Sequence, residues 1–260
     1  MQFINTRPVE RAQALTQCLR QAGIDVVELP LLELVARPCS TQLQTLYRQL
    51  VDVQVIVVVS PTAVQLGMQQ LQQSGLQLAQ LQHIKWVAVG QTTAQLLQEY
   101  GVESSVPEVE TSEGMLSLPI FQNNKDLKKI AFWRGEGGRQ FMMQQCLVDQ
   151  LEVLNFVLYE RQLPQQTWAK YQTLLSAHTK DPQSYIHCVS SEASWLNWLV
   201  LNQQHPELIN QCQYLVLGER LYQILQEYKK KNAMCFNIST LENLKVSTVL
   251  QHVMQLQRNI

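Results

Sequence analysis

The sequence predicts an α/β protein made of two similar lobes, each an open parallel β-sheet with helices packed against it. The first observation behind this prediction is a series of short valine- and isoleucine-rich runs, each followed by a helical pattern. Residues 55–59 carry no polar side chain on either face, which is typical of a strand buried on both sides of a parallel sheet. The second observation is an internal repeat. The chain has 260 residues, of which 46% are hydrophobic, enough for two lobes of about 130 residues each.

The repeat relates the second half of the sequence to the first at an offset of about 128 residues. The same four letters, Leu-Gln-Glu-Tyr, occur at 97–100 and at 225–228. The other correspondences are 86–90 with 214–218, 55–60 with 185–190, and Arg7, Arg11, Cys18 and Leu19 with Arg134, Arg139, Cys146 and Leu147. Two similar lobes follow from these matches, but the offset is the same whether the lobes are tandem, about 1–125 and 126–260, or interleaved.

The first elements of the chain are expected to be a strand, a helix and a second strand. A short strand is expected at Phe3-Ile4-Asn5. The helix expected from about Pro8 to Ala22 ends at Gly23, a residue that commonly follows the last helical turn. The strand expected at 26–29 is closed by Pro30.

Two further helices begin directly after buried strands. Ser60-Pro61-Thr62 offers a hydroxyl N-cap and a proline in the first turn, before apolar residues spaced as on one helix face. The next helix follows Gly90 and is expected to end at Gly101. Two proline-bounded segments, 30–38 and 158–164, look like connections between the lobes.

Charge and cysteine content exclude several classes of protein. Lys+Arg 20 against Asp+Glu 21 leaves a net charge of −1, which argues against a nucleic-acid-binding face. The 38 glutamines supply much of the polar surface in place of charge. The six cysteines form no Cys-x-x-Cys pair. The start lacks the basic and apolar regions of a signal peptide, and nowhere in the sequence does an apolar run reach roughly 18 residues. We expect a cytoplasmic protein with no membrane span.

The chemistry is expected at the carboxyl ends of the strands, where ligands bind in open parallel sheets. Hydroxyls, helix N-termini and arginines gather there, and such a rim suits an anion. The expected rim comprises Arg7, Ser60, Thr62, Gly90, Thr92, Thr93, Arg134, Gly135, Arg139, Ser190 and Ser191. Taken singly, the hydroxyls of Ser60, Thr92, Thr93, Ser190 and Ser191 are better explained by helix capping than by ligand contact. The five histidines are scattered, so we expect no metal and no cofactor.

Six short pieces occur in a particular order over most of the first 165 residues: Thr6-Arg7-Pro8, Pro30-Leu31-Leu32, 58–64, 87–94, the Arg134–Arg139 loop and Tyr159-Glu160-Arg161. In this order they resemble the uroporphyrinogen-III synthase family. The resemblance implies two interleaved lobes, residues 1–34 with 164–260 and residues 35–163. It also implies a two-stranded hinge between them and a ligand cleft.

The resemblance further implies a lyase that cyclises hydroxymethylbilane, with loss of water and inversion of ring D, to uroporphyrinogen III in heme biosynthesis. Tyr159 corresponds to the family tyrosine proposed to assist departure of the substrate hydroxyl, and Ser60 and Thr93 to cleft positions. The implied partners are this small molecule and, transiently, hydroxymethylbilane synthase, with no nucleic acid or membrane. We expect a monomer.

The C-terminal lobe departs from the family pattern. Ser190-Ser191-Glu192 stands where a Ser-Pro is usual, and Gly218-Glu219-Arg220 lacks the usual threonine. Two alternatives therefore stay open: a non-catalytic two-lobed binder of a small anionic ligand, and a degenerate family member acting as a partner module.

Overall fold

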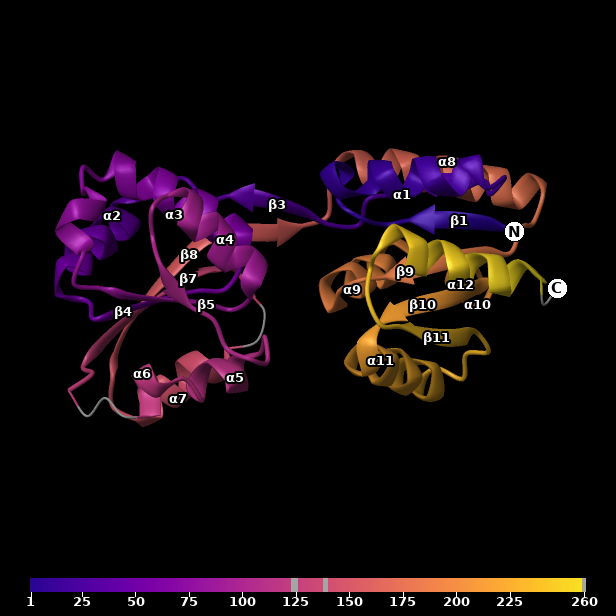
Figure 1. Cartoon of the computed structure of the whole chain (residues 1–260). Helices are drawn as coiled ribbons and strands as arrows, with labels where there is room; N and C mark the ends of the chain where they lie inside the picture. The colour runs from indigo at the N-terminus through magenta and orange to yellow at the C-terminus, as the bar shows by residue number, and fades with distance from the viewer. Residues whose placement is uncertain (123–125, 138–139, 259–260) are drawn as a thin grey trace. The chain divides into compact units, whose positions relative to one another are not determined.

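The structure is a computed structural model that describes residues 1–122, 126–137 and 140–258, and it divides the chain into two compact units. Unit 1 contains Met1–Glu33 and Gln162–Ile260, and unit 2 contains Leu34–Arg161. Each unit has one β-sheet with helices on both faces (Figure 1). The chain thus passes from one unit to the other twice.

The sheet of unit 1 has five strands, in the order β11-β10-β9-β1-β2. Neighbouring strands in it are parallel. The strands are β1 (Gln2–Asn5), β2 (Val26–Glu28), β9 (Tyr185–Val189), β10 (Cys212–Leu217) and β11 (Asn237–Leu241). The helices are α1 (Val9–Gln21), α8 (Gln166–Lys180), α9 (Glu192–Leu201), α10 (Pro206–Asn210), α11 (Gly218–Lys231) and α12 (Val246–Arg258).

Alternate residues of the unit 1 strands face opposite helical layers, as the period of a strand requires. Phe3 packs with α1 and α12 in one apolar cluster. Its neighbour Ile4 packs in the other cluster, which includes residues of α8, α9, α10 and α11. Both side chains are fully buried, so helices cover this strand on both faces.

The sheet of unit 2 has six strands, in the order β3-β8-β7-β4-β5-β6. The pairs β4–β5, β4–β7, β5–β6 and β7–β8 are parallel. The strands are β3 (Glu33–Ala36), β4 (Val55–Val58), β5 (Lys85–Ala88), β6 (Ser104–Ser105), β7 (Lys129–Gly135) and β8 (Glu152–Gln162). The helices are α2 (Thr41–Arg48), α3 (Pro61–Gln73), α4 (Gln91–Glu99), α5 (Ser112–Leu116), α6 (Pro119–Gln122) and α7 (Phe141–Val148), with 3-10 turns η1 (Gln49–Asp52) and η2 (Leu78–Leu81).

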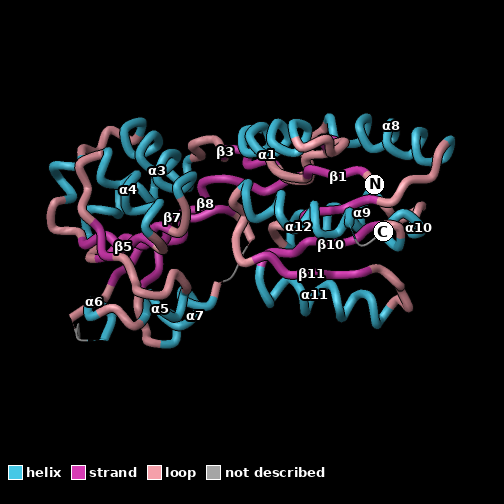
Figure 2. The backbone as a smooth tube through the Cα atoms, turned by 45° about the vertical axis from the view of Figure 1, so that its right-hand side comes forward, coloured by secondary structure: helices cyan, strands magenta, loops and turns pink. Residues whose placement is uncertain are grey.

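The core of unit 2 also has two layers. Ile56 and Val58 of β4 pack with α2, α3 and α4 in one cluster, while Val55 and Val57 pack with α5 and α7 in the other. All four side chains are fully buried. The α/β class and the buried parallel strands predicted from the sequence are confirmed, as is the placing of helices on both faces (Figure 2).

Local capping chemistry sets several helix ends where the sequence predicts them. Ser60 caps α3 with its hydroxyl, and Pro61 is the first helical residue. Gly23 and Gly101 follow α1 and α4 with φ of +78°, a left-handed conformation that glycine adopts without a steric penalty. In the part of the chain that the structure describes, none of the helices is long and apolar enough to cross a membrane.

The two connecting segments are strands that are neighbours at the edge of the unit 2 sheet (Figure 1). The Arg37 amide donates to the Leu158 carbonyl at 2.9 Å. On the unit 1 side of the boundary, Gln162 Nε2 donates to Glu33 Oε1 at 2.9 Å. The second connecting segment, expected at 158–164, begins inside β8, an eleven-residue strand that ends at Gln162.

Candidate functional site

In each sheet the strand order changes direction at one point, where two neighbouring strands are followed by connections that run to opposite sides. Ligands of open parallel sheets bind at such a point, which we call the strand reversal. In unit 1 the reversal lies between β1 and β9, and in unit 2 it lies between β7 and β4. The residues after these strands are Thr6-Arg7 and Ser190-Ser191 in unit 1, and Glu136-Gly137 and Val59-Ser60 in unit 2. Gly135 is the last residue of β7. Much of the expected rim thus follows the strands on either side of the two reversals.

The centre of the unit 2 site is a hydroxyl pair. Tyr159 Oη lies 3.0 Å from Ser60 Oγ, and either atom can be the donor. Ser60 Oγ also accepts from the Ala63 amide at 3.1 Å, in its capping role. Tyr159 is 1% exposed and packs in the unit core, whereas Ser60 is half-buried. The capping and functional interpretations of Ser60 are therefore compatible, because one oxygen serves both contacts.

The turn after β7 lies directly beside this pair. The register between β7 and β8 shifts after Arg134, so that Arg134 pairs with Val157 and Gly135 with Tyr159. The Glu136 amide then donates to the Tyr159 carbonyl at 2.7 Å. Such a bulge redirects the strand end. It brings the turn after Gly135 over the backbone of the tyrosine.

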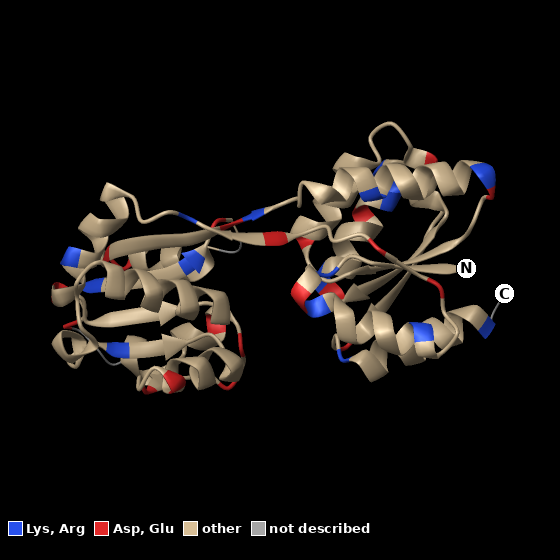
Figure 3. Ribbon diagram, turned by 90° about the horizontal axis from the view of Figure 1, so that it is seen from above, with Lys and Arg blue, Asp and Glu red and all other residues tan. Residues whose placement is uncertain are grey.

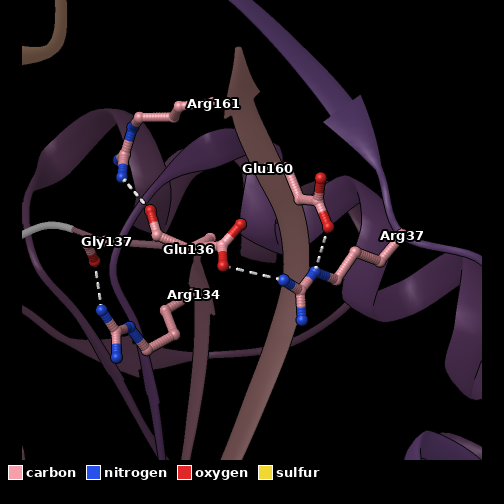
Figure 4. Close-up of polar contacts among 6 residues, drawn as sticks. All are labelled: Arg37, Arg134, Glu136, Gly137, Glu160 and Arg161. Atoms are coloured by element: carbon pink, nitrogen blue, oxygen red, sulfur yellow. Dashed lines mark hydrogen bonds and ion pairs between the residues drawn. The ribbon is translucent and has the colours of Figure 1, made fainter.

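Arg134 is buried at 7% exposure, and its Nη2 donates to the Gly137 carbonyl (Figure 4). Burial lowers the pKa of its guanidinium from the usual value, and the positive charge of Arg161 lowers it further. Arginine stays charged at neutral pH despite such shifts. Arg139, the other arginine expected in this loop, lies outside the described residues.

A network of charged side chains beside the turn was not foreseen from the sequence. Arg37 of the other connecting segment binds Glu160 Oε1 through Nε at 2.8 Å and Glu136 Oε1 through Nη2 at 3.0 Å. Arg161 Nη1 donates to the Glu136 carbonyl at 2.7 Å. Figure 4 shows the Glu136 carboxylate turned toward Arg37. Glu136 and Glu160 lie about 100 residues or more from Arg37 in the sequence. No local sequence pattern therefore predicts these ion pairs.

The start of α4 already holds a carboxylate of the chain itself. Glu110 Oε1 accepts from the Gln91 amide at 2.8 Å, and a Cβ at Gly90 would lie 2.3 Å from Glu110 Oε2. Thr93 is buried at 2% exposure, and Thr92 is exposed. Glycine at 90 is therefore explained by the close approach of Glu110, which the sequence did not indicate.

Thr62 and Ser190 make no contact that assigns them a role. Thr62 is half-buried in the first turn of α3. Ser190 is half-buried directly before the residue that caps α9.

The unit 1 site is held by bonds between distant parts of the chain. Thr6 Oγ1 donates to the Cys188 carbonyl at 2.7 Å, and Arg7 Nη2 donates to the Leu244 carbonyl at 2.7 Å. Ser191 caps α9 and accepts from the Ser194 amide at 3.2 Å. Arg220 is paired with Glu192 at 2.8 Å on the surface. The two segments that depart from the expected pattern are thus bound to one another.

No group of three or more His, Cys, Asp or Glu side chains suited to a metal ion occurs within residues 1–122, 126–137 and 140–258. The donors of the site are instead hydroxyls, amides and guanidinium groups. Such donors recognise the oxygens of an anion or of a hydroxyl.

Two doubly wound parallel sheets on one chain, each with hydroxyl and guanidinium groups at its strand reversal, define a two-unit α/β protein whose strand ends carry donors suited to an oxygen-rich ligand. The family model described as uroporphyrinogen-III synthase HemD matches residues 13–244. The chain therefore belongs to the uroporphyrinogen-III synthase family, whose members are lyases of heme biosynthesis.

Two relatives show how much of the chain aligns with known members of this family. The chain is 28% identical over 230 residues to a uroporphyrinogen-III synthase of Salmonella typhimurium, a match that covers 87% of this chain and 91% of that protein. It is 31% identical over 144 residues to the enzyme of the same name from Proteus mirabilis, covering 55% of this chain and 71% of that protein.

Solved structures show the same fold at low sequence identity. A mutant uroporphyrinogen III synthase from Thermus thermophilus aligns with a TM-score of 0.70 at 14% identity, over 100% of both chains. The synthetase of Helicobacter pylori aligns with a TM-score of 0.62 at 15% identity, over 98% of this chain and 99% of that one. The resemblance to this family stated from the sequence is confirmed.

Proposed function

We propose that this chain cyclises hydroxymethylbilane, with loss of water and inversion of ring D, to uroporphyrinogen III. The observation that carries the proposal within the site is the hydrogen-bonded pair of Tyr159 Oη and Ser60 Oγ beside the strand reversal of unit 2. A departing hydroxyl needs a proton donor within hydrogen-bond reach, and a phenol supplies one. The family membership of the chain supports the identity of the substrate.

The proposed reaction begins with loss of the ring A hydroxyl, which leaves as water after accepting a proton. Tyr159 supplies this proton. The resulting azafulvene cation attacks ring D at its substituted carbon, and the spiro intermediate fragments and recloses with ring D inverted. The final loss of a proton from ring D restores the aromatic pyrrole. This released proton balances the one that Tyr159 supplied to the departing hydroxyl. The substrate would approach the hydroxyl pair from the side of Ser60, because Ser60 is only half-buried whereas Tyr159 is 1% exposed.

Most of the proposed catalysis is control of geometry. Closure without inversion is the simpler reaction, so the protein must hold the linear substrate where the less favoured bond forms. Residues proposed to bind the substrate are those of the expected rim, with Arg7 and Ser191 in unit 1 and Ser60 and Arg134 in unit 2 held by the bonds described above. Thr6, which follows β1, and Arg161, near the end of β8, also lie at strand ends and are proposed to bind the substrate with them.

The charge distribution fits a polyanion that is bound locally. Lys and Arg are scattered over both units and interspersed with Asp and Glu (Figure 3). The chain as a whole carries a charge of −1. Binding of a polycarboxylate would therefore depend on amides, hydroxyls and a few arginines at the strand ends rather than on a broad positive field.

We further propose that the protein works as a cytoplasmic monomer that takes its unstable substrate from hydroxymethylbilane synthase in transient encounters. The six cysteines, all of them in the described residues, are free, as is usual in a reducing compartment. Sedimentation analysis of the purified protein tests the monomer.

The decisive experiment is an isomer assay. Freshly made hydroxymethylbilane is supplied, the products are oxidised, and the type I and type III isomers are separated by chromatography. Formation of mainly the type III isomer is expected. The type I isomer alone, as in buffer, would overturn the proposed activity and favour the non-catalytic binder of a small anion.

A further inference from the structure

A pocket of about 160 Å³ lies in unit 2 at the carboxyl ends of β4, β5 and β7. Its volume is about five times the roughly 30 Å³ that a water molecule occupies in the liquid. Val59, Val89 and Phe132 contribute apolar walls, and the side chains of Arg134 and Arg161 also line it. Among the described residues that line the pocket, none has a carboxylate.

Each of the two guanidinium groups forms a hydrogen bond to the turn after β7, and in both bonds the acceptor is a backbone carbonyl. Arg134 donates to the Gly137 carbonyl, and Arg161 donates to the Glu136 carbonyl at 2.7 Å (Figure 4). A guanidinium has five N–H donors, so each of these bonds uses only one. Like charges also repel across the pocket, and this repulsion is one cause of the lowered pKa of Arg134. Arg134 is buried at 7% exposure, whereas Arg161 is exposed. A charge buried like that of Arg134 is usually paired with an anion.

The nearest carboxylate of the turn is kept away from the pair. Glu136 belongs to the same turn, but its carboxylate binds Arg37 Nη2 at 3.0 Å, and Arg37 is itself fixed by Glu160 at 2.8 Å. Figure 4 shows the Glu136 carboxylate directed away from Arg134 and Arg161. Arg37 therefore prevents the chain's own carboxylate from neutralising the two arginines.

We propose that Arg134 and Arg161 form a subsite for one short carboxyalkyl side chain of the substrate, and that Arg37 keeps this subsite open by holding Glu136. The inference rests on the proposed function and deepens it. Paired guanidinium groups bind a carboxylate with charge-assisted hydrogen bonds, and the apolar walls suit the methylene groups that carry it.

The subsite lies next to the proposed proton donor. The guanidinium carbon of Arg161 is 5.5 Å from the centroid of the Tyr159 ring, and Gly135, which lines the pocket, is the β-sheet partner of Tyr159. The Tyr159 side chain does not itself line the pocket, so a carboxylate bound by the arginines would hold one part of the substrate near Tyr159 rather than against its hydroxyl. The subsite contributes position, and Tyr159 contributes the proton.

The first test measures binding without turnover, with uroporphyrin III as the probe and its fluorescence as the signal. Arg161→Gln removes the charge and leaves a shorter, neutral side chain with N–H donors. It is expected to weaken binding of the probe about 10- to 100-fold, whereas Arg48→Gln, an exposed change in α2 of the same unit, is expected to leave it unchanged. Equal binding by Arg161→Gln and the unchanged protein would overturn the proposal.

The second test addresses Arg37, a positioning residue. Arg37→Gln frees Glu136, so binding of the probe is expected to weaken several-fold. Adding both Glu136→Gln and Glu160→Gln to Arg37→Gln removes the two carboxylates that Arg37 holds and is expected to restore binding. Failure of the triple variant to recover, with a melting curve like that of Arg37→Gln, would show that Arg37 acts only through structure and would overturn its assigned role.

The isomer assay separates this inference from the proposed function. Under the inference, Arg161→Gln raises the KM for hydroxymethylbilane at least 10-fold and changes kcat much less. If the unchanged protein forms no type III isomer yet binds uroporphyrin in an Arg161-dependent manner, the activity fails and the subsite stands. If type III product forms with a KM that is insensitive to Arg161, the activity stands and the subsite fails.

Discussion

Gly135 faces the ring of Tyr159 so closely that a Cβ at position 135 would lie 2.2 Å from Tyr159 Cε2. This distance is far shorter than a van der Waals contact, so any side chain at 135 must displace the ring that carries the proposed proton donor. The φ angle at Gly135 is not in the left-handed region. The requirement for glycine here is therefore one of space and is imposed by the tyrosine.

Gly135→Ala is expected to reduce isomer-assay turnover at least 10-fold by displacing Tyr159 from Ser60. Overpacking of this kind also costs about 1–3 kcal/mol of unfolding free energy. Gly67→Ala is the matched control, because a Cβ there would lie 2.1 Å from Trp133 Cε3 in the same unit but away from the hydroxyl pair. Comparable thermal destabilisation with retained turnover is expected for the control, and equal turnover of the two variants would contradict the role assigned to Gly135.

Tyr159→Phe is expected to lower kcat by about 10²-fold or more, the usual range for loss of a general acid. Ser60 keeps its bond from the Ala63 amide in this variant, so the unfolding free energy should change by only about 1 kcal/mol. Rapid-quench turnover and a denaturant titration check the two parts. A kcat like that of the unchanged protein would assign the Tyr159 hydroxyl to packing alone.

Ser60→Ala separates capping from chemistry. Loss of an N-cap hydroxyl costs about 1 kcal/mol, and the same cost is expected for Ser40→Ala, since Ser40 caps α2 by accepting from the Leu43 amide at 3.2 Å. Only Ser60→Ala also removes the partner of Tyr159, so a reduced kcat is expected for that variant alone. Parallel melting curves with equal rates for both variants would argue that Ser60 is a cap and nothing more.

His187 should make the stability of unit 1 depend on pH. It is fully buried in β9, stacked on Trp198 with ring centroids 4.7 Å apart, and burial lowers its pKa from 6.5 to about 3. Between these values the unfolded chain binds a proton that the folded chain does not, so stability is complete above pH 6.5 and falls as the pH decreases toward 3. The loss at pH 5 is expected to be roughly 2 kcal/mol. Urea titrations at pH 7 and pH 5 measure it, and His187→Phe should abolish the difference attributable to this ring.

The two units are proposed to be separate domains, residues 1–34 with 164–260 and residues 35–163. A fragment of residues 35–163 should then fold alone, because it contains β4–β8 and both apolar clusters of unit 2. A fragment of residues 1–125 should not, because it lacks β7, which lies at the centre of that sheet. Cooperative thermal unfolding monitored by circular dichroism distinguishes them, and the reverse result would favour tandem lobes.

The parts of the fold that were predictable from the sequence are those with local causes. Valine runs indicate buried strands, and Ser60, Pro61 and Gly101 mark helix ends because capping and left-handed geometry involve only nearby residues. The site was predictable where a general rule applies, since strand carboxyl ends bind ligands in parallel sheets. Tyr159 was found through resemblance, because an isolated aromatic residue near a strand end has no signal of its own.

The parts that were not predictable depend on long-range pairing. Glu110 reaches the Gln91 amide, and Arg37 binds Glu136 and Glu160, only because the fold brings their backbones together. No periodicity or spacing encodes such contacts. The choice between tandem and interleaved units is of the same kind, because the repeat offset is identical in both.

The repeat acquires a further meaning when it is followed through the two sheets. Strands β1 and β2 correspond to β7 and β8, and β4, β5 and β6 correspond to β9, β10 and β11. Each unit thus combines the first two strands of one repeat with the last three of the other. This is the arrangement that results when two copies of a half-length chain exchange segments, as in a domain-swapped dimer, and are then fused end to end. In such a fused exchange the chain would pass between the units twice, as it does in this protein.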